Sequence, residues 1–194
     1  MTTSASAPEP GPAPTAASAL PSSPAQNPAS APSSSPAPLT VEELEAQELR
    51  LVLPHFTYED AWALGNLLVD LARERRAPVA IDITRGGQQL FHAALPGSTP
   101  DNDAWIARKR RVVERYGCSS FLVGTRFRAK GTTFEESSRL DPDVYAAHGG
   151  AFPIAVRGAG VIGTVVVSGL PQAADHAMVV EALARFVQAG APSA

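Results

Sequence analysis

The residues of this chain that could bind a metal or a cofactor are few and scattered. Imidazole, thiolate and phenolate groups are the usual ligands, and the candidates are His55, His92, His148, His176, Cys118, Tyr116 and Tyr145. No two of them show the H-x₃-H or C-x-x-C-H spacing that specifies a site. Ser168 lies in Ser-Gly-Leu rather than in G-x-S-x-G, and Cys118 has no recognisable base in the sequence. The common hydrolase classes are therefore disfavoured.

A second group of chemically interesting residues falls along one face of an expected helix. The helix is predicted from about Asn102 to Tyr116, with Asp101 as its N-cap. One face carries residues spaced i, i+3, i+7 and i+10, namely Asn102, Trp105, Lys109 and Val112. Lys109 is suited to pair with a ligand carboxylate, or with a structural or intersubunit acid. The arginines from Arg108 to Arg111 are interpreted as a solvated helix face rather than a nucleic-acid or localisation signal.

Three glycines, Gly158, Gly160 and Gly163, match the dinucleotide pattern G-x-G-x-x-G. That pattern binds pyrophosphate only when its glycines join a strand to a helix. Here Gly163 is followed by Thr-Val-Val-Val, whose branched side chains favour a strand. The sequence therefore predicts a β-hairpin over 151–156 and 161–167, with a glycine turn at 157–160, rather than a dinucleotide site.

The remaining periodicity predicts an α+β chain. Helices are expected over about 40–51, 57–76, 102–116, 119–130 and 175–189, the last with Asp175 as its N-cap. Strands are expected over 79–84, with one buried face, and over 88–94 as its hairpin partner. Residues 131–145 are polar and are predicted to be irregular. Two hairpins without β-α-β alternation indicate an antiparallel sheet with helices.

Composition divides the chain into a tail and one domain. Residues 1–38 hold ten of the eighteen prolines and only one charged side chain, Glu9, so we expect a disordered tail. Residues 39–194 are long enough for a single domain with its own core. The net charge of −3 provides no strong field for nucleic acid. No run approaches the ~20 apolar residues of a membrane span, and the N-terminus lacks the features of a secretory signal. We therefore expect a cytoplasmic protein with neither nucleic acid nor membrane as a partner.

Several stretches, in the same order along the chain, resemble one family. They are ITRGGQQLFHAALPG at 83–97, DNDAWIARKRRVVERYGCSS at 101–120, and HGGAFPI with GVIGTVVVSGLPQAADH within 148–176. The chain resembles the GlcG/HbpS-like family, the heme-degrading-domain proteins, from about Thr40 to Val187. The resemblance implies a profilin-like α/β (α+β) fold, with a central antiparallel sheet flanked by helices, and assembly into homo-oligomers. Some relatives bind heme, but the resemblance identifies no catalytic residue.

The resemblance makes heme the suspected cofactor. A heme site needs an axial ligand, an apolar pocket and cations for the propionates. His148 is the preferred ligand because it borders the glycine pair that opens the family stretch, and Lys109 is the propionate partner. His92 and Trp105 complete the cofactor-binding candidates. Each also has a structural interpretation: a backbone hydrogen bond for His148, packing for His92, a salt bridge for Lys109, and a core or interface position for Trp105.

Two functions stay open at this point. The first is a homo-oligomer that binds heme and that, if the domain label holds, also degrades it. The second is a non-catalytic oligomeric protein that binds another small ligand or acts as a scaffold. The helix with Trp105 and Lys109 is expected at a groove shared between subunits, because its polar face looks unsuited to burial against its own sheet. The sequence identifies neither the true ligand, nor the stoichiometry, nor the role of the tail.

Overall fold

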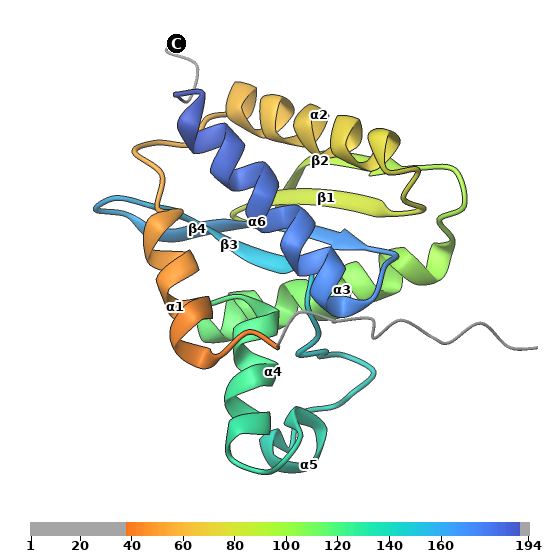
Figure 1. Ribbon diagram of the computed structural model, residues 1–194, viewed down its shortest axis with the longest axis vertical. Helices are drawn as coiled ribbons and strands as arrows, with labels where there is room; N and C mark the ends of the chain where they lie inside the picture. The colour runs from red at the N-terminus through yellow and green to blue at the C-terminus, as the bar shows by residue number, and fades with distance from the viewer. Residues whose placement is uncertain (1–37, 191–194) are drawn as a thin grey trace, which may run out of the picture. The chain divides into compact units, whose positions relative to one another are not determined.

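The computed structural model describes residues 38–190, so the prediction of a disordered tail concerns residues that, apart from Pro38, lie outside it. The described part alternates helices with two β-hairpins (Figure 1). In chain order the elements are α1 (Val41–Arg50), α2 (Tyr58–Glu74), β1 (Ala80–Arg85), β2 (Gln88–Ala94), α3 (Pro100–Tyr116), α4 (Ser120–Ala129), α5 (Phe134–Ser138), β3 (Ala151–Val156), β4 (Gly160–Ser168) and α6 (Gln172–Gln188). None of the helices within 38–190 is long and apolar enough to cross a membrane.

The four strands form one sheet in the order β2-β1-β4-β3, and all neighbours are antiparallel. Ile83 of β1 lies opposite Phe91 of β2 on one side and Val165 of β4 on the other. The second hairpin therefore pairs with the first through β4. Strands β1 and β4 are the two central strands of the sheet. The predicted antiparallel sheet flanked by helices is confirmed.

Alternation along the central strands sends side chains to two covered faces. Ile81 and Ile83 lie in the large apolar core beneath α2 and α6, which cover one face of the sheet (Figure 1). Ala80 and Val166 point the other way and pack against Ile106 of α3. The prediction that the first strand has one buried face is wrong. Its first five residues are buried, because α3 covers the face that we expected to be open to water.

Helix starts follow the capping rules, but two of them are displaced from the predicted residue. Thr40 and Thr57 cap α1 and α2 with reciprocal capping boxes, as the sequence indicates. Helix α3 has Thr99, not Asp101, at its N-cap, because the Asn102 side chain accepts the Thr99 N–H at 2.7 Å. Helix α6 begins at Gln172 after Pro171, which leaves Asp175 inside the first turn.

The segment predicted to be irregular contains a short helix, α5. Thr133 caps it through a capping box with Glu136, and Phe134 is buried against Phe127 of α4. The many polar residues of this segment made the prediction overlook Phe134, which anchors the helix. The prediction for 131–145 is therefore wrong for α5.

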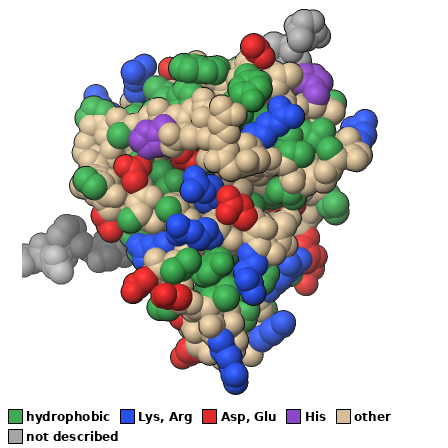
Figure 2. Space-filling view, turned by 180° about the vertical axis from the view of Figure 1, so that it is seen from behind, with side chains coloured by type: hydrophobic (Ala, Val, Ile, Leu, Met, Phe, Trp, Pro, Cys, Tyr) green, Lys and Arg blue, Asp and Glu red, His purple; other side chains and the backbone are tan. Residues whose placement is uncertain are grey.

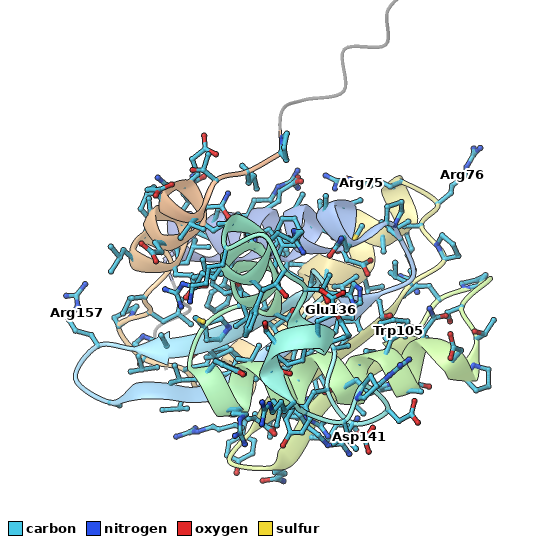
Figure 3. All side chains as sticks on the ribbon, turned by 90° about the horizontal axis from the view of Figure 1, so that it is seen from below. Arg75, Arg76, Trp105, Glu136, Asp141 and Arg157 are labelled. Carbon is cyan, nitrogen blue, oxygen red and sulfur yellow. The ribbon has the colours of Figure 1, made fainter. Side chains whose placement is uncertain are left out.

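The hairpin predicted at the glycine pattern is confirmed. Gly158, in the turn between β3 and β4, and Gly160, the first residue of β4, adopt φ values of 78° and 75°, which favour glycine. Arg157 projects from the tip of this hairpin, away from the rest of the domain (Figure 3). Gly163 lies within β4, so no helix follows the pattern, and the context needed for a dinucleotide is missing.

Candidate functional site

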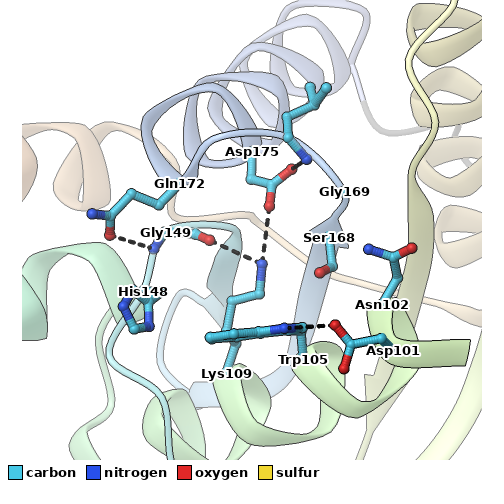
Figure 4. Close-up of a pocket in the computed structure, with 11 residues that line it drawn as sticks. Asp101, Asn102, Trp105, Lys109, His148, Gly149, Ser168, Gly169, Gln172 and Asp175 are labelled. Carbon is cyan, nitrogen blue, oxygen red and sulfur yellow. Dashed lines mark hydrogen bonds and ion pairs between the residues drawn. The ribbon is translucent and has the colours of Figure 1, made fainter. Parts of the chain in front are cut away.

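A polar cavity lies where α3 meets the end of β4, the start of β3 and the first turn of α6. Its volume is about 260 Å³ (Figure 4). Residues from four separate stretches line it: Asp101, Asn102, Trp105, Lys109, His148, Gly149, Ser168, Gly169, Leu170, Gln172 and Asp175. Three of the four predicted cofactor-binding residues, Trp105, Lys109 and His148, therefore meet at one cavity.

Lys109 lies at the base of this cavity with all three ammonium protons engaged. Its Nζ donates to the carbonyl oxygens of Gly149 and Val167 at 3.0 and 2.8 Å, and to Asp175 Oδ2 at 3.1 Å. The two charged side chains are only 3% and 4% exposed. Burial lowers the pKa of Lys109 and raises that of Asp175, while their mutual attraction acts in the opposite sense. This geometry favours the structural interpretation of Lys109, because no proton is left for a ligand carboxylate.

Asp175 also fastens the loop that enters α6. Its Oδ1 accepts the N–H of Leu170 at 3.0 Å, while its Oδ2 accepts Lys109. The prediction that Asp175 is an N-cap is wrong, since the N-cap is Pro171. The carboxylate instead lies inside the first turn of α6, near the positive end of the helix.

The glycine before β3 permits this arrangement. Gly150 adopts φ +120°, and a Cβ there would lie 2.3 Å from the Val167 oxygen and 2.6 Å from Lys109 Nζ. A larger residue would therefore push the ammonium away from its acceptors. The family stretch that begins HGGAFPI thus contains a glycine required by the buried ion pair.

Trp105 forms one wall of the cavity, and its ring contacts three other side chains. Its Nε1–H donates to Asp101 Oδ2 at 3.1 Å, and the Arg108 guanidinium lies 3.9 Å from the ring centroid. The His148 ring meets it edge-on, with centroids 5.2 Å apart and planes at 82°. These contacts are all within one chain, so they give Trp105 a place in a pocket wall without requiring a second subunit.

The expectation that α3 is too polar to pack on its own sheet is wrong. Ile106 and Val113 are buried against the sheet, and Lys109 between them reaches Asp175. The helix buries the charge of Lys109 in an ion pair with Asp175. Arg110 of the same helix also has partners within the chain, since it pairs with Asp82 and Glu114. Figure 2 shows basic and acidic side chains interspersed over one face of the molecule.

His148 stands at the side of the cavity with a half-buried ring. Its Nδ1 is buried and has no hydrogen-bond partner among residues 38–190. Burial lowers the pKa of His148, and the charges of Lys109, Arg128 and Arg108 lower it further, against Glu135, which raises it. The imidazole is therefore kept neutral near pH 7, and a neutral imidazole is the form that can bind a metal.

The fourth predicted residue, His92, is not brought to the cavity. It lies on β2, and its Nε2 is 2.9 Å from Asp103 Oδ1 in an exposed pair. The other candidate ligands are separate as well. His55 pairs with Asp60 at 3.2 Å, and His176 is buried with its Nε2 3.0 Å from Gln47 Oε1. Burial also raises the pKa of Cys118 to about 11, so it is an unreactive thiol at neutral pH.

Sequence reasoning missed Ser168, Gln172 and the partnership of Asp175 with Lys109. One signal was present: Lys109 is spaced with Ile106 and Val113 on an apolar stripe at i, i+3 and i+7. A lysine on a buried stripe requires an acid partner. Which acid it meets depends on the packing of α6. No cluster of three His, Cys, Asp or Glu residues suited to a metal ion occurs within the described residues.

The fold agrees with comparisons to known proteins. The family model described as "Haem degrading protein HbpS-like" matches residues 56–184, and the chain belongs to this family. A UPF0303 protein of Streptomyces avermitilis is 83% identical over 150 residues, which cover 77% of this chain and 92% of the relative. The crystal structure of the Ybr137w protein matches with a TM-score of 0.72 and 40% identity, covering 78% of this chain and 89% of that one.

A more distant structure shares the fold. The crystal structure of a PduOC:heme complex matches with a TM-score of 0.55 and 18% identity, over 66% of this chain and 93% of that one. At this identity the likeness concerns the fold. The recognition of a GlcG/HbpS-like chain is thus confirmed by the family match.

Proposed function

We propose that this chain binds heme at the mouth of the cavity, with His148 as the iron ligand. The observation that carries the proposal is the His148 imidazole, neutral at the cavity edge, with neither ring nitrogen hydrogen-bonded within residues 38–190. A free imidazole beside an aromatic wall is what an axial position requires. The family description and the heme complex of the PduOC relative support this choice of cofactor.

The residues around His148 fit heme as an open site. Trp105 provides a flat aromatic wall, and Arg108 and Arg128 lie close enough to act on His148 as charges. These guanidinium groups, rather than Lys109, would pair with the propionates. The cavity of about 260 Å³ is smaller than the ~300–1,000 Å³ pockets that enclose a ligand. Bound heme would therefore stay partly exposed, and it would supply redox-active iron at the surface.

A heme titration followed by absorbance tests the proposal. We expect a saturable Soret band from the full-length protein, and at least about tenfold weaker binding in His148→Ala. His92→Ala is the matched control, because it removes a histidine that lies away from the cavity. A wild-type spectrum identical to that of free heme, or equal loss in both variants, would contradict the proposal. If the family label of degradation applies, the band should decline irreversibly when a reductant and O₂ are added.

A second candidate is a non-catalytic protein that binds a small polar ligand. The polar lining of the cavity favours it, since Asn102, Ser168 and Gln172 all contribute groups that form hydrogen bonds. The same titration separates the two candidates. A protein that fails to bind heme but is stabilised by a small polar molecule would belong to this second class.

We also propose that the protein is cytoplasmic and assembles into a homo-oligomer. Trp62 and Tyr58 of α2 are 59% and 54% exposed, and large exposed aromatic side chains mark contact surfaces. Sedimentation at micromolar concentration tests assembly, and Trp62→Ala should weaken it more than Trp105→Ala. A wild-type monomer would refute assembly, and a stronger effect of Trp105→Ala would restore the α3 groove as the interface.

A further inference from the structure

The cavity is lined by a hydroxyl group that makes no hydrogen bond to the described residues. Ser168, at the end of β4, is 3% exposed, and its side chain lines the cavity. Its Oγ makes no hydrogen bond within residues 38–190, and Figure 4 shows no interaction from it to the residues around it. The residue is buried, but it borders the open space of the cavity, where its hydroxyl group can form a hydrogen bond. The hydroxyl is therefore positioned to meet something that enters the cavity.

Asn102 presents a hydrogen-bond donor to the same space. Its Oδ1 accepts the backbone N–H of Thr99 at 2.7 Å and lies 3.3 Å from the Thr99 hydroxyl. Because the oxygen is committed to the helix start, the amide NH₂ is turned toward Ser168 (Figure 4). The identity of the two amide atoms is thus determined by the backbone donor, and the side facing the cavity is the donating one.

The charged side chains that line the cavity disfavour a ligand with more than one negative charge. Helix α6 starts at its edge with Pro171, which provides no side-chain cap for the first-turn N–H groups. Lys109 and Asp175 cancel one another. Asp101 faces the cavity as a carboxylate, partly satisfied by the Trp105 indole. Asp101 would repel a doubly charged ligand about twice as strongly as a singly charged one, and the positive start of α6 offsets part of the smaller repulsion.

We propose that this cavity binds a small monocarboxylate, whose oxygens accept hydrogen bonds from Ser168 Oγ and Asn102 Nδ2 while its body rests against Trp105. A planar carboxylate has two acceptor oxygens, which matches two donors on one side of a cavity. The volume of about 260 Å³ limits the ligand to a small molecule. The inference rests on the proposal that this cavity is the ligand site, but it does not require heme.

Trp105 can report the binding directly. The chain has two tryptophans, so Trp62→Phe in the full-length protein leaves Trp105 as the only one. We expect sodium acetate, at millimolar concentration and constant ionic strength, to change its fluorescence in a saturable way and to raise the melting temperature. Sodium chloride is the control for ionic strength, and inorganic phosphate is the control for charge.

Two variants test the two donors. Ser168→Ala removes the hydroxyl group and should weaken acetate binding by about three- to tenfold. Asn102→Asp keeps an oxygen for the Thr99 N–H but replaces the donating NH₂ with a charged oxygen, so it should abolish binding. Ser137→Ala, at an exposed position of α5, is the matched control and should bind as the parent does. Unfolding curves for each variant separate loss of binding from loss of fold.

The inference is overturned if acetate has no effect beyond that of chloride, if phosphate binds more tightly than acetate, or if both cavity variants titrate like Ser137→Ala. The heme proposal is tested separately, by the Soret band of the wild type and of His148→Ala. Heme binding without an acetate response would therefore refute the carboxylate alone. An acetate response without a Soret band would refute heme alone.

Discussion

The two faces of the sheet are both buried, but they are buried with different chemistry. The face under α2 and α6 is filled almost entirely by aliphatic and aromatic side chains, including Leu64, Leu68 and Phe186. The face under α3 has a smaller apolar cluster and hides polar groups beside it, among them Asp82 and Lys109. Apolar burial stabilises without direction, whereas buried polar groups require specific partners. The first face therefore holds the fold together, and the second one positions the cavity.

The buried ion pair should give the largest effect of any single substitution on the α3 face. Lys109→Ala leaves Asp175 buried and unpaired and also removes donors from two backbone carbonyls. We expect the free energy of unfolding, measured with urea, to fall by about 3–5 kcal/mol. The double variant Lys109→Met with Asp175→Leu should recover most of that loss, because no charge stays buried. A loss below about 1 kcal/mol in Lys109→Ala would show that water reaches the carboxylate.

The opposite face should respond through packing alone. Leu64 of α2 is fully buried in the larger core, and Leu64→Ala removes its contacts and leaves a cavity. We expect a loss of about 2–5 kcal/mol that is independent of pH. Acetate and heme binding should be unchanged in solution conditions where the variant is folded. An altered ligand affinity would show that the two faces are coupled through the sheet.

A smaller effect is expected from pH at a histidine between the two regions. His176 of α6 is buried beside Phe121 and Phe152, and burial lowers its pKa from 6.5 to about 4. Above pH 6.5 the side chain is neutral in both the folded and the unfolded chain. As the pH falls toward 4, the unfolded chain gains a proton that the folded chain excludes, so stability decreases.

The size of this pH effect follows from the pKa difference. A difference of this size corresponds to about 3 kcal/mol, lost progressively as the pH falls from 6.5 through 4. His176→Gln should flatten the curve of unfolding free energy against pH, while His92→Gln, at an exposed position, serves as the control. Identical pH curves for wild type and His176→Gln would contradict the assignment.

Much of the fold could be predicted because its signals are local. The two hairpins and the capping boxes at Thr40 and Thr57 depend on residues a few positions apart. The errors at Asp101 and Asp175 have one cause, since an acidic residue near a helix start resembles an N-cap even when its carboxylate is used elsewhere. The carboxylate of Asp101 accepts the Trp105 indole N–H four residues on, and that of Asp175 accepts Lys109 across 66 positions.

The candidate site was predicted only in part, for a related reason. His148, Lys109 and Trp105 were named from residue type and from the family resemblance, and the structure places them around one cavity. The imidazole of His92 is as suitable a ligand as that of His148, but β2 places it on another surface, where it pairs with Asp103. Ser168 was passed over, because a serine at the end of a strand has no distinguishing neighbour in the sequence.

The sequence by itself determined the elements other than α5, the antiparallel hairpins and the family, because local propensity and motif order are properties of neighbouring residues. Only the tertiary structure decided that α3 covers the second face of the sheet, that Lys109 meets Asp175 across 66 positions, and that Ser168 faces Asn102. These contacts join residues far apart in the chain. They depend on how helices pack on a twisted sheet, and a buried charge or hydroxyl has no meaning until its surroundings exclude water.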